Sequence, residues 1–143
     1  MRVFVAAATG AIGQPLIAEL VRQGHTVTGM THSEAGARKL VERGAAIAQV
    51  STFDAPAVEQ ALRYAKAEVV IDQLTPLPIH PSALITTVPG DRKLRMEGGE
   101  NLYRAVLASG VRRSMQQSSG FFLKAGKGLA DESEPLAIDA SAG

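Results

Sequence analysis

The sequence predicts an α/β fold: a Rossmann-like, doubly wound parallel sheet that is truncated after about the fifth strand. Three observations support this prediction. Short apolar runs alternate with long helical patterns, a glycine turn joins the first run to the first helix, and glycines close several of the helical patterns. Parallel strands need such crossovers, and the crossover helices then cover both faces of the sheet.

The first strand and helix are marked by the clearest pattern in the chain. Residues 2–8 form a continuous apolar run that predicts a buried strand. A turn over Thr9–Gly13 follows, and Pro15 then opens an amphipathic helix. Gly24 ends this helix, because glycine adopts the left-handed conformation at low cost, and a second strand is expected over His25–Met30.

The same alternation continues through two more units. Ser33 is suited to cap a second helix that Gly44 closes, and residues 45–50 read as the third strand. Asp54 can cap a third helix, which leads into an apolar fourth strand over residues 68–72. The repeated order of strand and helix predicts parallel pairing throughout.

The pattern changes after the fourth strand. Residues 74–81 form a proline-bearing segment, which indicates either a functional loop at the carboxyl edge of the sheet or a mobile connector. A helix is expected from Asp91 to Ser109, closed by Gly110, and a fifth strand over residues 111–118. This strand is too polar for burial on both faces, so we expect it at an exposed edge or poorly formed.

Composition narrows the classes of function. The chain has 143 residues, of which 45% are hydrophobic, so we expect one domain over residues 1–123 and a loop-rich tail over residues 124–143. The net charge is +1 and aromatic residues make up 4%, which argues against a nucleic-acid partner. Zero cysteines and three scattered histidines indicate no metal site. The apolar stretch at the N-terminus is too short for a signal peptide, and no run suits a membrane span, so we expect a cytoplasmic protein without a membrane partner.

The glycine turn between the first strand and the first helix is the main functional signal. Such a turn aims free helix amides and the positive end of the helix dipole at the space above the sheet, which suits a pyrophosphate. Gly10 allows the backbone to approach a phosphate, and Gly13 allows the helix to pack close to the strand. The alternative is that both glycines only make a tight turn.

Residues Val3–Gly13 resemble the N-terminus of the extended and atypical short-chain dehydrogenase/reductase family, the NAD-dependent epimerase/dehydratase group. The turn of that family is Gly-x-x-Gly-x-x-Gly. Gly10 and Gly13 match it, whereas Ala7 replaces the first glycine. If this position needs a positive φ or lies against the cofactor, the methyl group costs roughly 1 kcal/mol or more.

The resemblance implies a dinucleotide site, for NADP or NAD, along the carboxyl ends of four strands. The strand end Thr31–Ser33 lacks the acid that binds the ribose in NAD-preferring members, and Arg38 and Lys39 follow, which slightly favours NADP. A solvated helix face is the alternative for both cations, and an exposed helix cation is the alternative for Arg95. Ser51 stands where the family often has an acid near the adenine. The residues implied to bind the cofactor are Ala7, Thr9, Gly10, Ala11, Ile12, Gly13, Thr31, His32, Ser33, Arg38, Ser51, Thr52, Gln73, Leu74, Thr75 and Arg95.

The resemblance also implies a catalytic serine. Residues 117–122 resemble the serine-bearing strand end of the family, so Ser119 would hydrogen-bond the substrate oxygen. Family chemistry further needs a tyrosine with a lysine four residues later, and neither Tyr64 nor Tyr103 can serve. The resemblance thus covers the N-terminal half or less of a family enzyme, and the substrate is unknown.

Two interpretations of function stay open. The chain is either the NAD(P)-binding part of an oxidoreductase or a nucleotide-sugar epimerase or dehydratase, or it is a non-catalytic NAD(P)-responsive module or truncated relic. A homo-oligomer, or completion by another chain, is a further possibility that the sequence leaves open.

Overall fold

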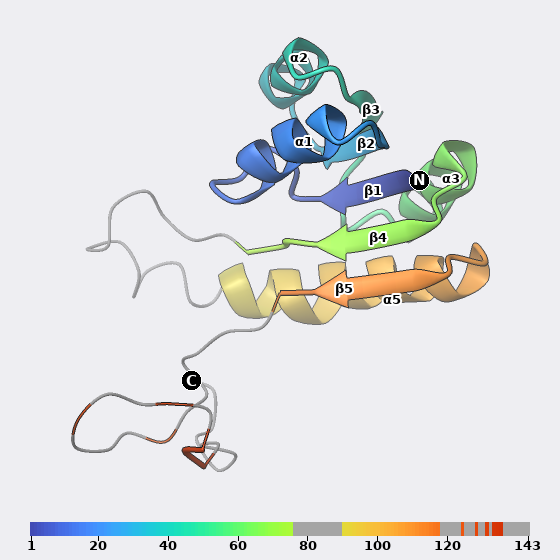
Figure 1. Ribbon diagram of the computed structural model, residues 1–143. Helices are drawn as coiled ribbons and strands as arrows, with labels where there is room; N and C mark the ends of the chain where they lie inside the picture. Colours follow the sequence, from blue (N-terminus) through green and yellow to red (C-terminus); the bar gives the residue numbers. More distant parts are fainter. Residues whose placement is uncertain (76–89, 118–123, 125–127, 129–130, 132, 136–143) are drawn as a thin grey trace.

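The computed structural model describes residues 1–75, 90–117, 124, 128, 131 and 133–135. Strands and helices alternate along the chain, and the colours of Figure 1 follow them. In chain order they are β1 (Arg2–Ala6), α1 (Gly13–Arg22), β2 (Thr26–Thr31), α2 (Glu34–Glu42), β3 (Ala46–Gln49), α3 (Ala55–Ala65), β4 (Val69–Asp72), the π-helical turn η2 (Leu94–Gly98), α5 (Gly99–Ala108) and β5 (Arg113–Gln116).

The five strands form one parallel sheet in the order β3-β2-β1-β4-β5 (Figure 1). Val5 of β1 pairs with Gly29 on one side and with Ile71 on the other, so β1 lies at the centre. The chain winds outward from β1 toward β3 and then crosses back to β4. This arrangement confirms the predicted doubly wound α/β fold, and the reversal between β1 and β4 marks the place where such sheets bind ligands.

Side chains of the central strands alternate between two cores. One core contains Phe4 and Val70 of the sheet and is covered by α3 and α5. The other contains Val3 and Val5 and is covered by α1 and α2 through Ile17 and Leu40. Burial on both faces explains why the strands read as continuous apolar runs in the sequence.

The predicted caps are confirmed. The hydroxyl of Ser33 accepts a hydrogen bond from the Gly36 N–H at 3.1 Å, and the carboxylate of Asp54 accepts one from the Ala57 N–H at 3.1 Å. Each cap satisfies a backbone donor that the first turn of its helix would otherwise leave unpaired. The glycines after α1, α2 and α5 have positive φ, at 77° for Gly24, 76° for Gly44 and 68° for Gly110.

The first strand and helix differ in their bounds from the prediction. β1 ends at Ala6, because Ala7 has a φ of 52° and leaves the extended conformation. Helix α1 begins at Gly13, two residues before Pro15. The turn therefore runs from Ala7 to Ile12, whereas the sequence pattern predicts a turn from Thr9 to Gly13.

Strand β5 lies at the edge of the sheet, and all four of its residues are exposed, as the polar sequence predicts. Other predictions fall outside the described residues: residues 76–81 of the proline-bearing segment, the end of the fifth strand at Ser118, and most of the tail over residues 124–143.

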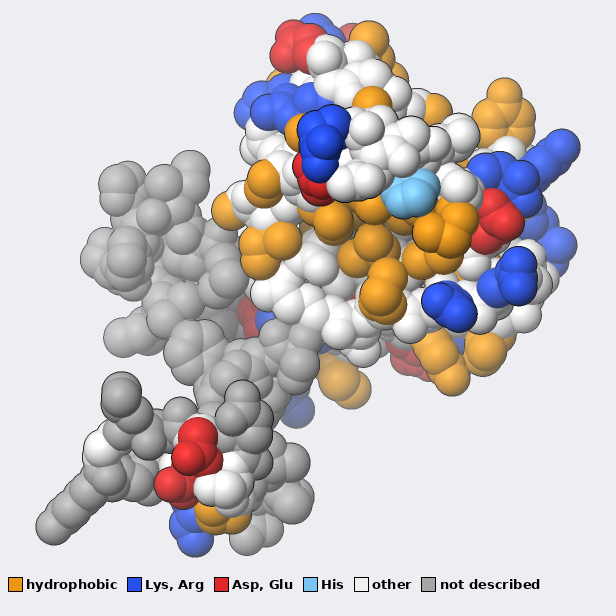
Figure 2. Space-filling model, viewed as in Figure 1, with side chains coloured by type: hydrophobic (Ala, Val, Ile, Leu, Met, Phe, Trp, Pro, Cys, Tyr) orange, Lys and Arg blue, Asp and Glu red, His pale blue; other side chains and the backbone are white. Residues whose placement is uncertain are grey.

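Within the described ranges, no helix is long and apolar enough to cross a bilayer, and no group of three or more His, Asp or Glu side chains is arranged to hold a metal ion. Acidic and basic side chains both appear on the face drawn in Figure 2, and neither kind covers it.

Gly13 is the residue at which a side chain would disturb this fold most directly. A Cβ atom there would lie 2.7 Å from the carbonyl carbon and oxygen of Ala8 and closer still to the Ala7 carbonyl oxygen. We predict that Gly13→Ala lowers the free energy of unfolding by about 3 kcal/mol, measured by urea denaturation. Gly99→Ala is the control, because its Cβ meets nothing within 4 Å, and it should be neutral or stabilise α5. Equal stability of the two variants would contradict the packing role of Gly13.

Candidate functional site

The predicted site residues that the structure describes follow four strands at one edge of the sheet. Ala7 comes directly after β1, Thr31 ends β2, and Thr52 and Gln73 follow β3 and β4. Because the strands are parallel, these carboxyl ends meet at the same edge. The crevice outside them, at the reversal between β1 and β4, is where an open α/β sheet takes a ligand.

The glycine turn is open to solvent. The Gly10 N–H donates to the Ala7 carbonyl at 3.0 Å, and the Gln14 N–H donates to the Gly10 carbonyl at 3.1 Å. Gly10, Ala11 and Ile12 are exposed. Within the described part of the chain, the N–H groups of Ala11 and Ile12 meet no acceptor. Free amides at the start of α1, on the positive end of its dipole, suit an anion.

Two residues outside the predicted site hold this turn in place. The Gln14 side chain donates to the Thr9 carbonyl at 2.9 Å, and its own oxygen accepts a hydrogen bond from Arg43 at 2.9 Å. Arg43 also donates to the Lys39 carbonyl at 3.1 Å. Gln14 could have been suspected as a polar side chain in the first turn of α1, but its partner Arg43 is 29 residues away.

The end of β2 and the start of α2 come close to the glycine turn at Gly36. A Cβ atom on Gly36 would lie 3.0 Å from the Ser33 hydroxyl, 3.1 Å from the Thr9 methyl and even closer to the Thr31 hydroxyl. Thr31 is buried, whereas His32 is exposed. Three predicted residues, Thr9, Thr31 and Ser33, are therefore brought together around one glycine.

Arg38 lies on the solvent side of α2. Its side chain is 69% exposed and its guanidinium is 3.8 Å from the Glu34 carboxylate one turn earlier. An exposed pair of this kind contributes little to stability. The Arg38 guanidinium thus lies in solvent beside the Glu34 carboxylate. The sequence-based preference for NADP did not take this acid into account.

The two predicted residues after β3 differ in exposure. Ser51 is exposed, and its hydroxyl accepts a hydrogen bond from the Phe53 N–H at 3.3 Å. Thr52 is 8% exposed and its hydroxyl donates to the Gly98 carbonyl at 3.1 Å. The Thr52 hydroxyl is therefore bound within the fold.

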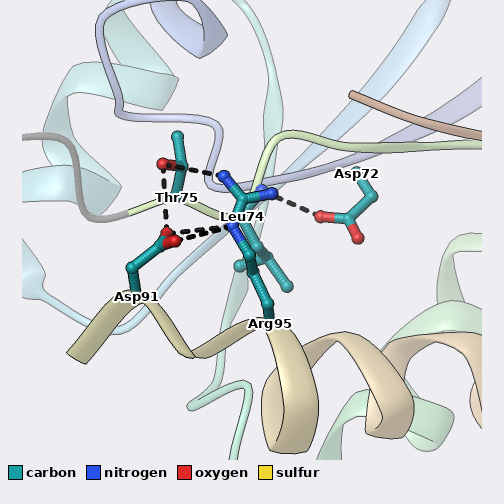
Figure 3. Close-up of polar contacts among 5 residues, drawn as sticks. All are labelled: Asp72, Leu74, Thr75, Asp91 and Arg95. Carbon is teal, nitrogen blue, oxygen red and sulfur yellow. Dashed lines mark hydrogen bonds and ion pairs between the residues drawn. The ribbon is translucent and has the colours of Figure 1, made fainter. Parts of the chain in front are cut away.

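Asp72 at the end of β4 is a buried acid that the sequence prediction placed in the strand but not in the site. Its carboxylate is 2.8 Å from the Leu74 N–H (Figure 3). Burial raises the pKa of Asp72, while the Leu74 hydrogen bond and the positive charge of Arg95 oppose that rise. The signal was available in the sequence, since Asp72 is the acid that closes an otherwise apolar run.

Arg95 of η2 is tied to the segment that follows β4. Its Nε atom lies 2.9 and 3.0 Å from the two Asp91 carboxylate oxygens, and its Nη2 atom is 3.5 Å from the Thr75 hydroxyl (Figure 3). Asp72 and Arg95 both line a hollow of about 350 Å³ between the ends of β4 and β5 and α5. The sequence left an exposed helix cation as the alternative interpretation of Arg95. Its side chain is only 32% exposed and is paired with Asp91, which does not fit that alternative.

Two buried amide oxygens lie at the same edge. The Oε1 atoms of Gln73, after β4, and Gln117, after β5, have no hydrogen-bond partner among the residues that the structure describes. A buried carbonyl oxygen without a donor is costly. Ser119, the predicted catalytic serine, lies outside the described residues.

Residues 7–140 match the family described as NAD(P)H-binding. Among curated proteins, the 3-diazoavenalumate denitrifying reductase of a Streptomyces species is 37% identical over 145 residues, covering 98% of this chain and 45% of that reductase.

Solved structures show the same similarity. The UDP-glucose 4-epimerase of Thermus thermophilus in complex with NAD is 26% identical with a TM-score of 0.79, and the match covers 95% of this chain and 44% of the epimerase. A short-chain dehydrogenase/reductase superfamily protein of Agrobacterium tumefaciens with bound NAD is 25% identical with a TM-score of 0.71, covering 94% and 38%. The chain thus spans less than half the length of each of these proteins.

The sequence predicts an energetic cost at Ala7 if this position needs a positive φ. The structure meets that condition, because the φ of Ala7 is 52°. We predict that Ala7→Gly raises the free energy of unfolding by up to about 1 kcal/mol, because glycine adopts this conformation without a Cβ penalty. Ala8→Gly is the control. Ala8 is fully buried in the core beside α1, so its loss should destabilise. A lower melting temperature for Ala7→Gly would contradict the prediction.

Asp72 predicts a pH dependence of stability. Because burial raises its pKa, the folded state holds this proton more tightly than the unfolded chain. The contribution of Asp72 to stability therefore falls as pH rises from the ordinary carboxyl pKa through the raised one. Asp72→Asn keeps an acceptor for the Leu74 N–H but cannot ionise. Its stability relative to the unmodified protein should increase between about pH 4 and about pH 8 in urea denaturation. A constant or falling difference would contradict this.

Proposed function

This chain belongs to the NAD(P)H-binding family, within the short-chain dehydrogenase/reductase and epimerase group, and we propose that it binds a nicotinamide dinucleotide at the carboxyl edge of its sheet. The observation that carries this proposal is the open glycine turn at the start of α1, whose Ala11 and Ile12 amides have no acceptor in the described part of the chain. A pyrophosphate is the group that this position accepts best.

The residues fit the group. Neither Gly10 nor Gly13 places a side chain between the turn and a phosphate, and Gly10, Ala11 and Ile12 are exposed. The Thr31–Ser33 strand end would hold the adenosine ribose, and Ser51 with the backbone of Thr52 would lie beside the adenine. Gln73, Leu74 and Thr75 would line the nicotinamide half. When bound, the nicotinamide ring supplies a hydride donor or acceptor.

For the protein as a whole we propose oxidoreductase or epimerase chemistry. A reductase and a UDP-glucose 4-epimerase are among the proteins that this chain resembles. Ser119 would hydrogen-bond the substrate oxygen in such a reaction. The alternative is an NAD(P)-responsive binding module, and one observation favours it for this chain alone. Neither Tyr64 nor Tyr103 has a lysine four residues later, because those positions hold Glu68 and Leu107.

We propose NADP as the slightly favoured cofactor. No acid lies at Thr31–Ser33 to bind a ribose 2′-hydroxyl, and Arg38 is exposed one turn into α2. Glu34 acts against this preference, because its carboxylate lies 3.8 Å from the Arg38 guanidinium.

Fluorescence titration of the purified chain with NADPH and NADH tests the proposal. Saturable binding is expected for at least one of them, and Gly10→Asp should weaken it at least about ten-fold by placing a negative charge at the phosphates. Gln60→Glu is the control, since it adds the same charge on α3, away from the glycine turn. No saturable binding at about millimolar cofactor would reject the proposal.

The same titration tests the preference for NADP. Arg38→Gln should weaken the binding of NADPH several-fold and leave that of NADH unchanged. An equal effect on both cofactors would assign Arg38 to the solvated face of α2.

A further inference from the structure

One contact joins parts of the carboxyl edge that the sheet itself keeps apart. Thr52 follows β3, whereas Gly98 and Asn101 belong to the crossover between β4 and β5. Strands β2 and β1 lie between β3 and β4 in the sheet. The Thr52 hydroxyl nevertheless donates to the Gly98 carbonyl at 3.1 Å, and the Asn101 side chain donates to the Thr52 carbonyl at 3.1 Å.

The contact is close and largely dry. A Cβ atom on Gly98 would lie 2.8 Å from the Thr52 methyl and 2.9 Å from its hydroxyl, so only glycine fits opposite Thr52 without movement. Gly98 is buried and Thr52 is 8% exposed. Hydrogen bonds in such surroundings cost more to break than exposed ones, because the separated groups are left without water.

A second link runs between the same two segments. The Lys93 ammonium group lies 5.2 Å from the centre of the Phe53 ring, within the range of a cation–π contact. Lys93 immediately precedes η2 and Phe53 immediately follows Thr52. We call the five residues Thr52, Phe53, Lys93, Gly98 and Asn101 the clasp.

The clasp also reaches the β4 side of the crevice. Arg95 lies between Lys93 and Gly98 in the chain, and it bonds to Asp91 and approaches Thr75 after β4. The segment from Lys93 to Gly98 therefore contacts the β3 side through both of its ends and the β4 side through Arg95 between them, so it links the two sides.

We propose that the clasp sets the width of the crevice for a dinucleotide, and that Thr52 is a positioning residue whose hydroxyl acts through Gly98 rather than on the cofactor. This inference rests on the proposed function. A dinucleotide must contact the β3 side with its adenine half and the β4 side with its nicotinamide half, so its affinity depends on their separation. The Thr52 hydroxyl already donates its proton to the Gly98 carbonyl. This bond favours a positioning role for Thr52 over direct contact with a ligand.

Three substitutions separate positioning from general stability. Thr52→Val keeps the shape of the side chain but removes its hydroxyl, and Thr52→Ser keeps the hydroxyl. Val106→Ala is the matched control, because Val106 is buried on α5 and takes no part in the clasp. NADPH and NADH affinities are measured by fluorescence titration well below the melting temperature of each variant.

Thr52→Val should weaken binding of the better cofactor at least about five-fold, whereas Thr52→Ser and Val106→Ala should stay within about two-fold of the unmodified protein. Equal affinities of Thr52→Val and the unmodified protein would overturn the inference, as would equal losses in Thr52→Val and Val106→Ala. If Thr52→Val does not fold, Asn101→Ala replaces it, and a loss of at least about five-fold is expected again. An affinity of Asn101→Ala equal to that of the unmodified protein would overturn the inference. Absence of binding by the unmodified protein is a separate result, which rejects the proposed function itself.

Discussion

Helix α1 starts where its first residue touches the backbone of the two residues that follow β1. Gly13 has no side chain, and the carbonyl groups of Ala7 and Ala8 occupy the space that a Cβ would need. This contact lets the helix pack closely against the turn. The helix has no side-chain cap, and the Ala11 and Ile12 amides meet no acceptor among the described residues. Ala7, whose carbonyl oxygen lies nearest to that Cβ position, has a left-handed conformation with a φ of 52°. The anion site that we propose lies directly at this close approach.

The rest of the site depends on polar contacts between segments that are distant in the sequence. Gln14 and Arg43 hold the glycine turn, Asp91 holds Arg95, and Thr52 joins the segment after β3 to the start of α5. These side chains make their hydrogen bonds within the protein and leave backbone amides and exposed hydroxyl groups for a ligand. A preformed site of this kind would lose less conformational entropy on binding the proposed cofactor. The residues that hold this edge are thus largely distinct from those that we propose to contact the cofactor.

Much of the fold was predictable because local chemistry determines it. Ser33 and Asp54 cap their helices as predicted, since a side-chain oxygen next to free amides has the same effect in any fold. The exposed edge position of β5 followed from its polar residues, which no buried strand accommodates. The turn boundaries were less accurate. The positive φ of Ala7 and the close contact of Gly13 with Ala7 and Ala8 lie at these boundaries, and apolar periodicity carries no information about either.

The sequence by itself determined the order of strands and helices, the glycine turn and the family, because these are encoded by short spacings along the chain. Only the tertiary structure decided which polar residues meet. It paired Gln14 with Arg43 and Thr52 with Gly98 and Asn101, and it buried Asp72 beneath the crevice near Arg95. The physical reason is that hydrogen bonds and desolvation depend on distance in space, and parallel crossovers bring together residues whose separation along the chain gives no sign of their contact.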